Sequence, residues 1–147
     1  MAFQRGSHGD SMVYLEDADG VVLNGVAKSA TFDTAWYNMG ACDWFGLAWV
    51  HTVTGTSPTW DLDVEWTADS SASTVVAHDY PDAANSQTGA ASAQITATGN
   101  AVPEYWRNIN PLRSTALTPA IRAEVTIGGT SPSFTTTGYL IRVYRGA

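Results

Sequence analysis

A strict alternation of apolar and acidic side chains runs through Trp60-Asp61-Leu62-Asp63-Val64-Glu65-Trp66. Successive side chains of a β-strand point to opposite faces, so this stretch predicts a strand with one buried face and one hydrated, acidic face. Residues 121–127 alternate in the same way, with Arg122 and Glu124 on the hydrated face. Both stretches therefore predict strands that cover a core on one side only.

Further strand patterns cover residues 44–53 and 134–144. Both faces of residues 44–53 are apolar, which predicts a strand that is covered on both sides. The apolar pattern of residues 134–144 shifts near Gly138, which predicts a bulge at that glycine. Shorter candidates are residues 12–15, 21–23, 30–37, 74–77 and 94–98. About eight to nine short strands without a helical period predict an all-β fold, an antiparallel β-sandwich.

A short internal sequence repeat refines this prediction. The run Gly55-Thr56-Ser57-Pro58 recurs as Gly129-Thr130-Ser131-Pro132, each time between two strand patterns. Glycine supplies unusual backbone angles and proline stops ladder pairing, so each run predicts the tip of a long hairpin. Two such hairpins predict a jelly-roll-like sandwich. Chance similarity between two turn sequences is the alternative explanation of the repeat.

The length of 147 residues suits one domain. We expect residues 1–29 to form an N-terminal arm and residues 30–147 to form a single jelly-roll-like β-sandwich domain. Residues 103–118 contain two prolines and read as a long ordered loop. An ordered polar arm suggests packing on a partner, because such termini are otherwise mobile.

The net charge of −7 argues against a nucleic-acid partner, since phosphates would be repelled. No run of apolar residues approaches the roughly 20 needed for a membrane-spanning helix, so no membrane partner is expected. Residues 1–111 carry three basic residues against thirteen acidic ones, a net charge of −10, whereas residues 112–147 carry four against one, a net of +3. This polarity suits either charge-to-charge docking or an ordinary mixed surface.

Few residues suggest chemistry. The best carboxylate cluster is Asp61, Asp63 and Glu65, which reads as a hydrated strand face, with a Ca²⁺ site or a catalytic pair as alternatives. Residues 16–20 resemble part of a calcium loop but read as an acidic turn. His51 is expected in the core or at its rim, and the single cysteine, Cys42, as a buried thiol. We therefore predict no enzyme activity, no catalytic residue, no metal site and no cofactor.

Contact with neighbouring proteins is the remaining expectation. Loop aromatics, the N-terminal arm and nearby arginines are the side chains suited to it. The predicted interface residues are Phe3, Arg5, Tyr80, Tyr105, Trp106, Arg107 and Arg113.

The strand-rich segments resemble a known group of proteins. Leu47–Trp66, with its His51–Thr59 run, Gln94–Gly99, and Arg122–Tyr144, with Gly-Gly-Thr-Ser-Pro-Ser-Phe-Thr at residues 128–135, resemble small β-sandwich head decoration (cement) proteins of tailed bacteriophages. The resemblance implies a virion structural protein on the capsid exterior that binds the major capsid protein as a homo-oligomer, with a trimer favoured. It implies no catalytic residues. A tail or fibre-tip virion protein and a carbohydrate-binding module are the alternatives.

Overall fold

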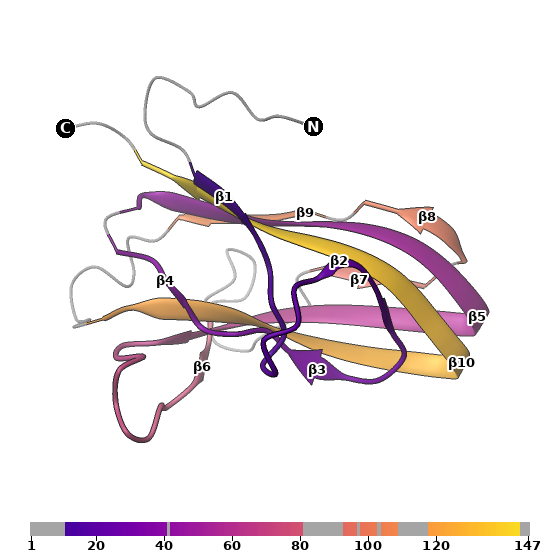
Figure 1. Cartoon of the computed structure of the whole chain (residues 1–147), viewed down its shortest axis with the longest axis horizontal. Coiled ribbons are helices and arrows are strands. Elements are labelled where there is room, and N and C mark those ends of the chain that lie inside the picture. The colour runs from indigo at the N-terminus through magenta and orange to yellow at the C-terminus, as the bar shows by residue number, and fades with distance from the viewer. Residues whose placement is uncertain are drawn as a thin grey trace.

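A computed structural model describes residues 11–40, 42–80, 93–96, 98–102, 104–108 and 118–144 (Figure 1). All regular structure in these residues is β-strand. The strands are β1 (Ser11–Tyr14), β2 (Asn24–Lys28), β3 (Phe32–Asp33), β4 (Tyr37–Asn38), β5 (Trp44–Thr67), β6 (His78–Asp79), β7 (Ala93–Ile95), β8 (Gly99–Ala101), β9 (Glu104–Asn108) and β10 (Ala120–Val143). Among the described residues there is no helix with the length and apolar character to cross a membrane.

Two strands of 24 residues each, β5 and β10, organise the fold. They pair antiparallel along nearly their whole length, from Trp44 opposite Val143 to Thr67 opposite Ala120. The register shifts only between Gly128 and Ser133. At this point the two-stranded ribbon bends back on itself, at the right of Figure 1, so that its halves lie in two layers.

The short strands complete the two layers. The first sheet joins β1 and β2 to the C-terminal half of β10, then the N-terminal half of β5, then β8 and β9. The second sheet joins β3 and β4 to the N-terminal half of β10, then the C-terminal half of β5, then β6 and β7. Every one of these pairings is antiparallel. The predicted all-β antiparallel sandwich is confirmed.

The two Gly-Thr-Ser-Pro runs lie at the bend, and the prediction that they form hairpin tips is wrong. Each run is a corner inside a continuous strand, and Thr56 of one pairs with Thr130 of the other. A Cβ atom added to Gly55 would lie 2.7 Å from the Ser131 carbonyl oxygen, and one added to Gly129 would meet the Ser57 carbonyl. The sequence repeat thus reflects two equivalent corners that cross closely, which only glycine permits.

Large side chains of both sheets meet in one core. The largest fully buried ones include Trp49, Trp60, Phe45 and Phe134. Trp60, Leu62 and Val64 are buried, as the alternation predicted, and the acidic residues between them face outward. The prediction that residues 44–53 are covered on both faces is wrong for the second half of the stretch, where Val50 is 47% exposed and Thr52 is exposed, whereas Gly46 on the same side is buried.

Residues 11–28, inside the segment expected to be an arm, carry β1 and β2. Both strands pair with β10. Leu15 and Leu23, between them in sequence, are completely buried in the common core. Residues 1–10 lie outside the described residues.

Two further expectations need correction. Residues 74–77 are not a strand, and pairing with β5 occurs instead at His78–Asp79. Residues 103–118 are not wholly a loop, since Glu104–Asn108 forms β9 and pairs with Trp44–Ala48. The backbone there completes an edge of the first sheet.

Gly138 does not form the expected bulge against β5. The buried positions Phe134, Thr136, Gly138 and Leu140 alternate without interruption, and Gly138 lies directly opposite Trp49. A register shift does occur between Thr136 and Thr137, but against β2. The apparent slip arises because the inward position has no side chain: an added Cβ would lie 2.5 Å from Trp49 Cζ3 and 3.0 Å from Leu15 Cδ1.

Replacing Gly138 with alanine tests this packing. Because Trp49 is fully buried and cannot move aside, we expect Gly138→Ala to lower the free energy of unfolding by about 1–3 kcal/mol in urea titrations. Thr135→Ala, at an exposed position of the same strand, is the control and is expected to cost less than about 1 kcal/mol. An alanine variant as stable as the wild-type protein would contradict the close contact.

Candidate functional site

The outer surface of the second sheet is acidic. Glu65 and Arg122, and Asp63 and Glu124, are cross-strand pairs of β5 and β10. The flanking strands add Asp33 beside Glu124 and Asp79 beside Glu65. We call this surface the acidic face; its charged residues are Asp33, Asp61, Asp63, Glu65, Asp79, Arg122 and Glu124.

Arg122 holds part of this face together. Its guanidinium lies 2.8 Å from Asp33 Oδ2 through Nη1 and 2.5 Å from Glu65 Oε2 through Nε. It also lies 4.9 Å from the centre of the Trp36 ring, a cation–π distance. One cation therefore ties β3 and β5 to β10, and the face keeps more carboxylates than cations.

The excess of carboxylates over cations on the acidic face affects the pKa values of two of them. Partial burial, then the charges of Asp79, Asp61 and Glu65, raise the pKa of Asp63. Burial and neighbouring carboxylates likewise raise the pKa of Glu124, against the opposing effect of Arg122. The face therefore disfavours its own ionised state.

The structure bears on the calcium alternatives. Among the residues that it describes, no group of three His, Cys, Asp or Glu side chains is arranged to hold a metal ion. In the loop at residues 16–20, Asp17 is 4% exposed and accepts hydrogen bonds from the backbone N–H groups of Asp19 and Val21, at 3.0 and 2.9 Å. Lys28 pairs with its other oxygen at 2.5 Å. Burial alone would raise the pKa of Asp17, but these partners lower it, so the carboxylate organises an acidic turn.

The histidines differ in their surroundings. His51 is buried, as expected, with Nδ1 3.0 Å from Thr136 Oγ1, and its ring packs against those of Trp60 and Phe134. His78 is exposed at the sheet edge, and its ring lies 5.1 Å from that of Trp66. His8 lies outside the described residues. Cys42 is buried, as predicted, and its Sγ lies 3.9 Å from Met39 Sδ.

The outer surface of the first sheet has the opposite character. Its rows run from Met12 through Ile141 to Gly46, and from Tyr14 through Tyr139 to Ala48. We call it the apolar face; its residues are Met12, Tyr14, Trp44, Gly46, Ala48, Val50, Tyr139, Ile141 and Val143. None of these nine residues is charged, although Glu104 of the neighbouring β9 is paired with Ala48, and Gly46 is buried rather than exposed. Tyr14 is 45% exposed, and its ring lies 5.1 Å from that of Tyr139.

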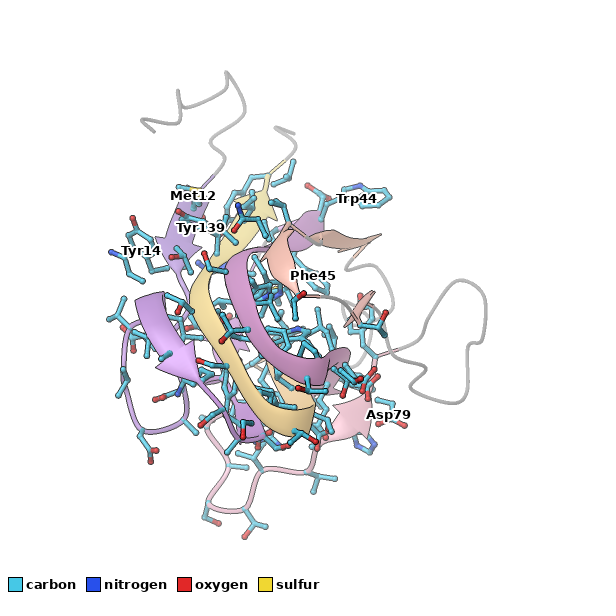
Figure 2. The ribbon with its side chains drawn as sticks, turned by 90° about the vertical axis from the view of Figure 1, so that its right-hand side faces the viewer. Met12, Tyr14, Trp44, Phe45, Asp79 and Tyr139 are labelled. Carbon is cyan, nitrogen blue, oxygen red and sulfur yellow. The ribbon has the colours of Figure 1, made fainter. Side chains whose placement is uncertain are left out.

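Figure 2 shows how these side chains lie. Met12, Tyr14 and Tyr139 gather on one side of the ribbon, and Trp44 projects at the end of β5. Sequence reasoning missed this face, because apolar residues on both sides of residues 44–53 were interpreted as double coverage. The inward residues Phe45, Leu47 and Trp49 are larger than Gly46 and Ala48, the outward residues between them, and this difference is the signal in the middle of the strand, although Trp44 on the outward side is also large.

The predicted interface residues are placed only in part. Tyr80 is not an exposed loop contact: it is 4% exposed and its ring packs edge-on against Phe45 at 5.2 Å. Tyr105, Trp106 and Arg107 belong to β9, with their backbones opposite Leu47, Gly46 and Phe45. Phe3, Arg5 and Arg113 lie outside the described residues.

Charge is separated by face in this structure. Arg122, from the basic C-terminal stretch, lies within the acidic face, so the two stretches of opposite net charge are not kept apart in space. The fold instead gathers Asp33, Asp61, Asp63, Glu65, Asp79 and Glu124 on the outer surface of the second sheet, whereas the rows of β1, β10 and β5 on the outer surface of the first sheet are uncharged. When the sequence is compared with models of protein families and with curated proteins, none matches.

The buried His51 predicts a pH dependence of stability. Burial lowers its pKa from 6.5 to about 4. Between pH 6.5 and about pH 4, His51 of the unfolded chain takes up a proton that the folded protein excludes. The contribution of His51 to the free energy of unfolding therefore falls as the pH falls through this range, and it does not change with pH above the range. The loss attributable to His51 is about 3 kcal/mol.

The variant His51→Gln isolates this contribution, because the carboxylates are shared by both proteins. Urea unfolding between pH 7.5 and pH 4 should show a steeper loss for the wild-type protein than for the variant. Equal slopes would show that His51 is protonated as easily in the folded protein as in the unfolded chain.

Removing one charge from the acidic face should stabilise the protein. At pH 7, Asp63→Asn relieves repulsion from Asp61, Glu65 and Asp79, and we expect thermal unfolding to shift upward by roughly 2–4 °C. The gain should shrink as the pH falls, because the raised pKa of Asp63 means that this carboxyl neutralises itself in the folded state. Asp19→Asn, in an exposed turn, is the control and should have little effect. A lower melting temperature for Asp63→Asn would show that its charge is favourably paired.

Proposed function

We propose that the protein is a non-enzymatic structural component of a tailed-phage virion, a head decoration protein. It binds the major capsid protein on the exterior of the capsid, acts as a homo-oligomer and stabilises the head through contacts alone. The resemblance of Leu47–Trp66 and Arg122–Tyr144 to decoration proteins supports this function, and the all-β antiparallel sandwich is compatible with the jelly roll that the resemblance implies.

The observation that carries the proposal is the apolar face. Soluble proteins expose few contiguous apolar surfaces, and such surfaces mark sites of contact with other macromolecules. Here the surface is formed by regular, paired strands rather than by loops, and Tyr14 and Val50 are each nearly half exposed. A rigid, preformed surface loses little conformational entropy when it binds.

The requirements of a decoration protein fit these features. A shell accessory must add contact area between neighbours, and the many copies on a shell make modest individual contacts effective through avidity. The two unlike outer faces allow one subunit to present different surfaces to different neighbours. The acidic face would meet a basic or hydrated environment, and the apolar face an apolar one.

Virions with and without the protein provide the test. We expect cryo-electron microscopy of wild-type particles to show jelly-roll density on the outside of the shell. Particles from a phage with a stop codon in the gene should lack that density and release DNA at a temperature lower by several degrees, since the shell loses contacts between its subunits. Complementation in trans should restore both properties.

Other locations would contradict the decoration role. Density at the tail or fibre tip would assign the protein to those structures, and absence from the particle would end the proposal of a virion protein. In that second case, selective binding on a glycan array would favour a carbohydrate-binding module that uses its exposed tyrosines.

A further inference from the structure

The pairing of β5 with β10 has an internal two-fold symmetry. Exchanging each residue of β5 with the residue of β10 that lies 74 positions later converts the pairs made by residues 120–128 into the pairs made by residues 46–54. Both sets of pairs are present in the structure. Thr56 and Thr130, which lie opposite each other, exchange places. The two long strands are therefore related by a two-fold axis that passes through the pair of Thr56 and Thr130.

The backbone at the two corners has the same symmetry. Ser57 and Ser131 both have a φ of 48°, in the left-handed region. Gly55 and Gly129, two positions earlier, have φ angles of 118° and 106°. A Cβ atom added to either glycine would meet the carbonyl oxygen of the serine in the other corner. The two corners thus have the same conformation and make the same contact with each other.

The short strands follow the same two-fold relation. β1 pairs with Tyr139, and β6 pairs with its equivalent, Glu65. β2 pairs with Phe134, and β7 pairs with its equivalent, Trp60. β3 and β8 correspond in the same way, as do β4 and β9. Strands β1 to β5 and strands β6 to β10 therefore form two units with the same strand order and equivalent pairing partners.

We infer that the chain is a two-fold pseudo-dimer of two successive five-stranded units, residues 11–67 and residues 78–143, and that each unit is the binding partner of the other. All pairings between the described strands join a strand of one unit to a strand of the other. Neither unit therefore forms a sheet by itself, and the partner that this interface fits is a second unit of the same topology. The inference concerns the isolated chain and does not rest on the proposed function.

Side-chain packing makes the two units complementary rather than interchangeable. Trp49 lies opposite Gly138, and a Cβ atom added to Gly138 would lie 2.5 Å from the Trp49 ring. The equivalent of Gly138 in the first unit is Val64, so two copies of the first unit would put a valine side chain against Trp49. Two copies of the second unit would place Ala123 opposite Gly138 and remove the large side chain that fills this part of the core. Packing therefore selects the pairing of the two unlike units.

Cutting the full chain between the two units tests the inference. Residues 71–74 are exposed in the loop that projects before β6 (Figure 1), so a recognition sequence for a specific protease can be inserted between Ser73 and Thr74. We expect the cut protein to keep its β-sheet circular dichroism and to give one complex of both fragments in native mass spectrometry. Its melting temperature should fall on tenfold dilution, unlike that of the uncut chain, because folding has become bimolecular.

Two results of the cut would overturn the inference. If the fragments separate and one of them keeps the β-sheet signal, that unit has a core of its own. If the uncut chain with the insertion is folded but the fragments unfold and stay apart at high micromolar concentration, the units are not binding partners.

The contact between Trp49 and Gly138 provides a matched pair of variants of the cut protein. Gly138→Ala should raise the dissociation constant of the two fragments by about 5–150-fold. Thr135→Ala, at an exposed position of the same strand, should raise it by less than about fivefold. Equal effects of the two substitutions would contradict the selection of unlike units by this contact.

Three alanine variants of the uncut chain test the equivalence of the units without a cut. Gly55→Ala and Gly129→Ala create the same contact with a backbone carbonyl, so both should lower the melting temperature by similar amounts, at least about 4 °C each. Gly99 has a φ of 105° but no atom within 4 Å of an added Cβ, so Gly99→Ala is the control for backbone strain and should have a smaller effect. If alanine is tolerated at one corner and not at the other, the two units are not equivalent.

Discussion

The antiparallel pairing of β5 with β10 is the interaction on which the rest of the molecule depends. Each strand is long enough to run through both sheets, and the pair supplies the two central strands of each. Every other strand pairs with one of these two. Folding the ribbon in half at the Gly-Thr-Ser-Pro corners brings its two inner surfaces together and creates the core. The packing of the core therefore depends on the geometry of the corners.

The same constraint explains why the outer faces differ. Because β5 crosses from one sheet to the other, its C-terminal half contributes Asp61, Asp63 and Glu65 to the acidic face, and its N-terminal half contributes Gly46, Ala48 and Val50 to the apolar face. β10 divides in the same way, with Arg122 and Glu124 on one side and Tyr139 and Ile141 on the other. Two outer surfaces of unlike chemistry therefore come from two continuous strands, which shared backbone hydrogen bonds hold rigidly together.

Much of this fold could be predicted from local patterns, because period-two alternation reports directly on which residues face inward. Residues 60–66 and 121–127 were assigned correctly to half-buried strands on that basis. The hairpin interpretation of the Gly-Thr-Ser-Pro runs failed because glycine and proline mark a change of direction without stating whether the chain reverses within one sheet or passes to the facing one. One corner pairs with the other, since Thr56 lies opposite Thr130, 74 positions later in the sequence. A pairing over this sequence distance cannot be read from a short local stretch.

The candidate site was harder to predict for a related reason. When both phases of an alternating strand are apolar, as in residues 44–53, hydrophobicity cannot decide which phase enters the core. Volume decides it here: Trp49 needs the space opposite Gly138, where no side chain stands, and this contact commits Phe45, Leu47 and His51 to the interior. The small residues Gly46 and Ala48 then occupy the outer side, opposite Ile141 and Tyr139 of β10, and Gly46 is still buried there. A strand that is apolar on both sides therefore need not be covered along the whole of its outer side, because Val50 of this strand is 47% exposed.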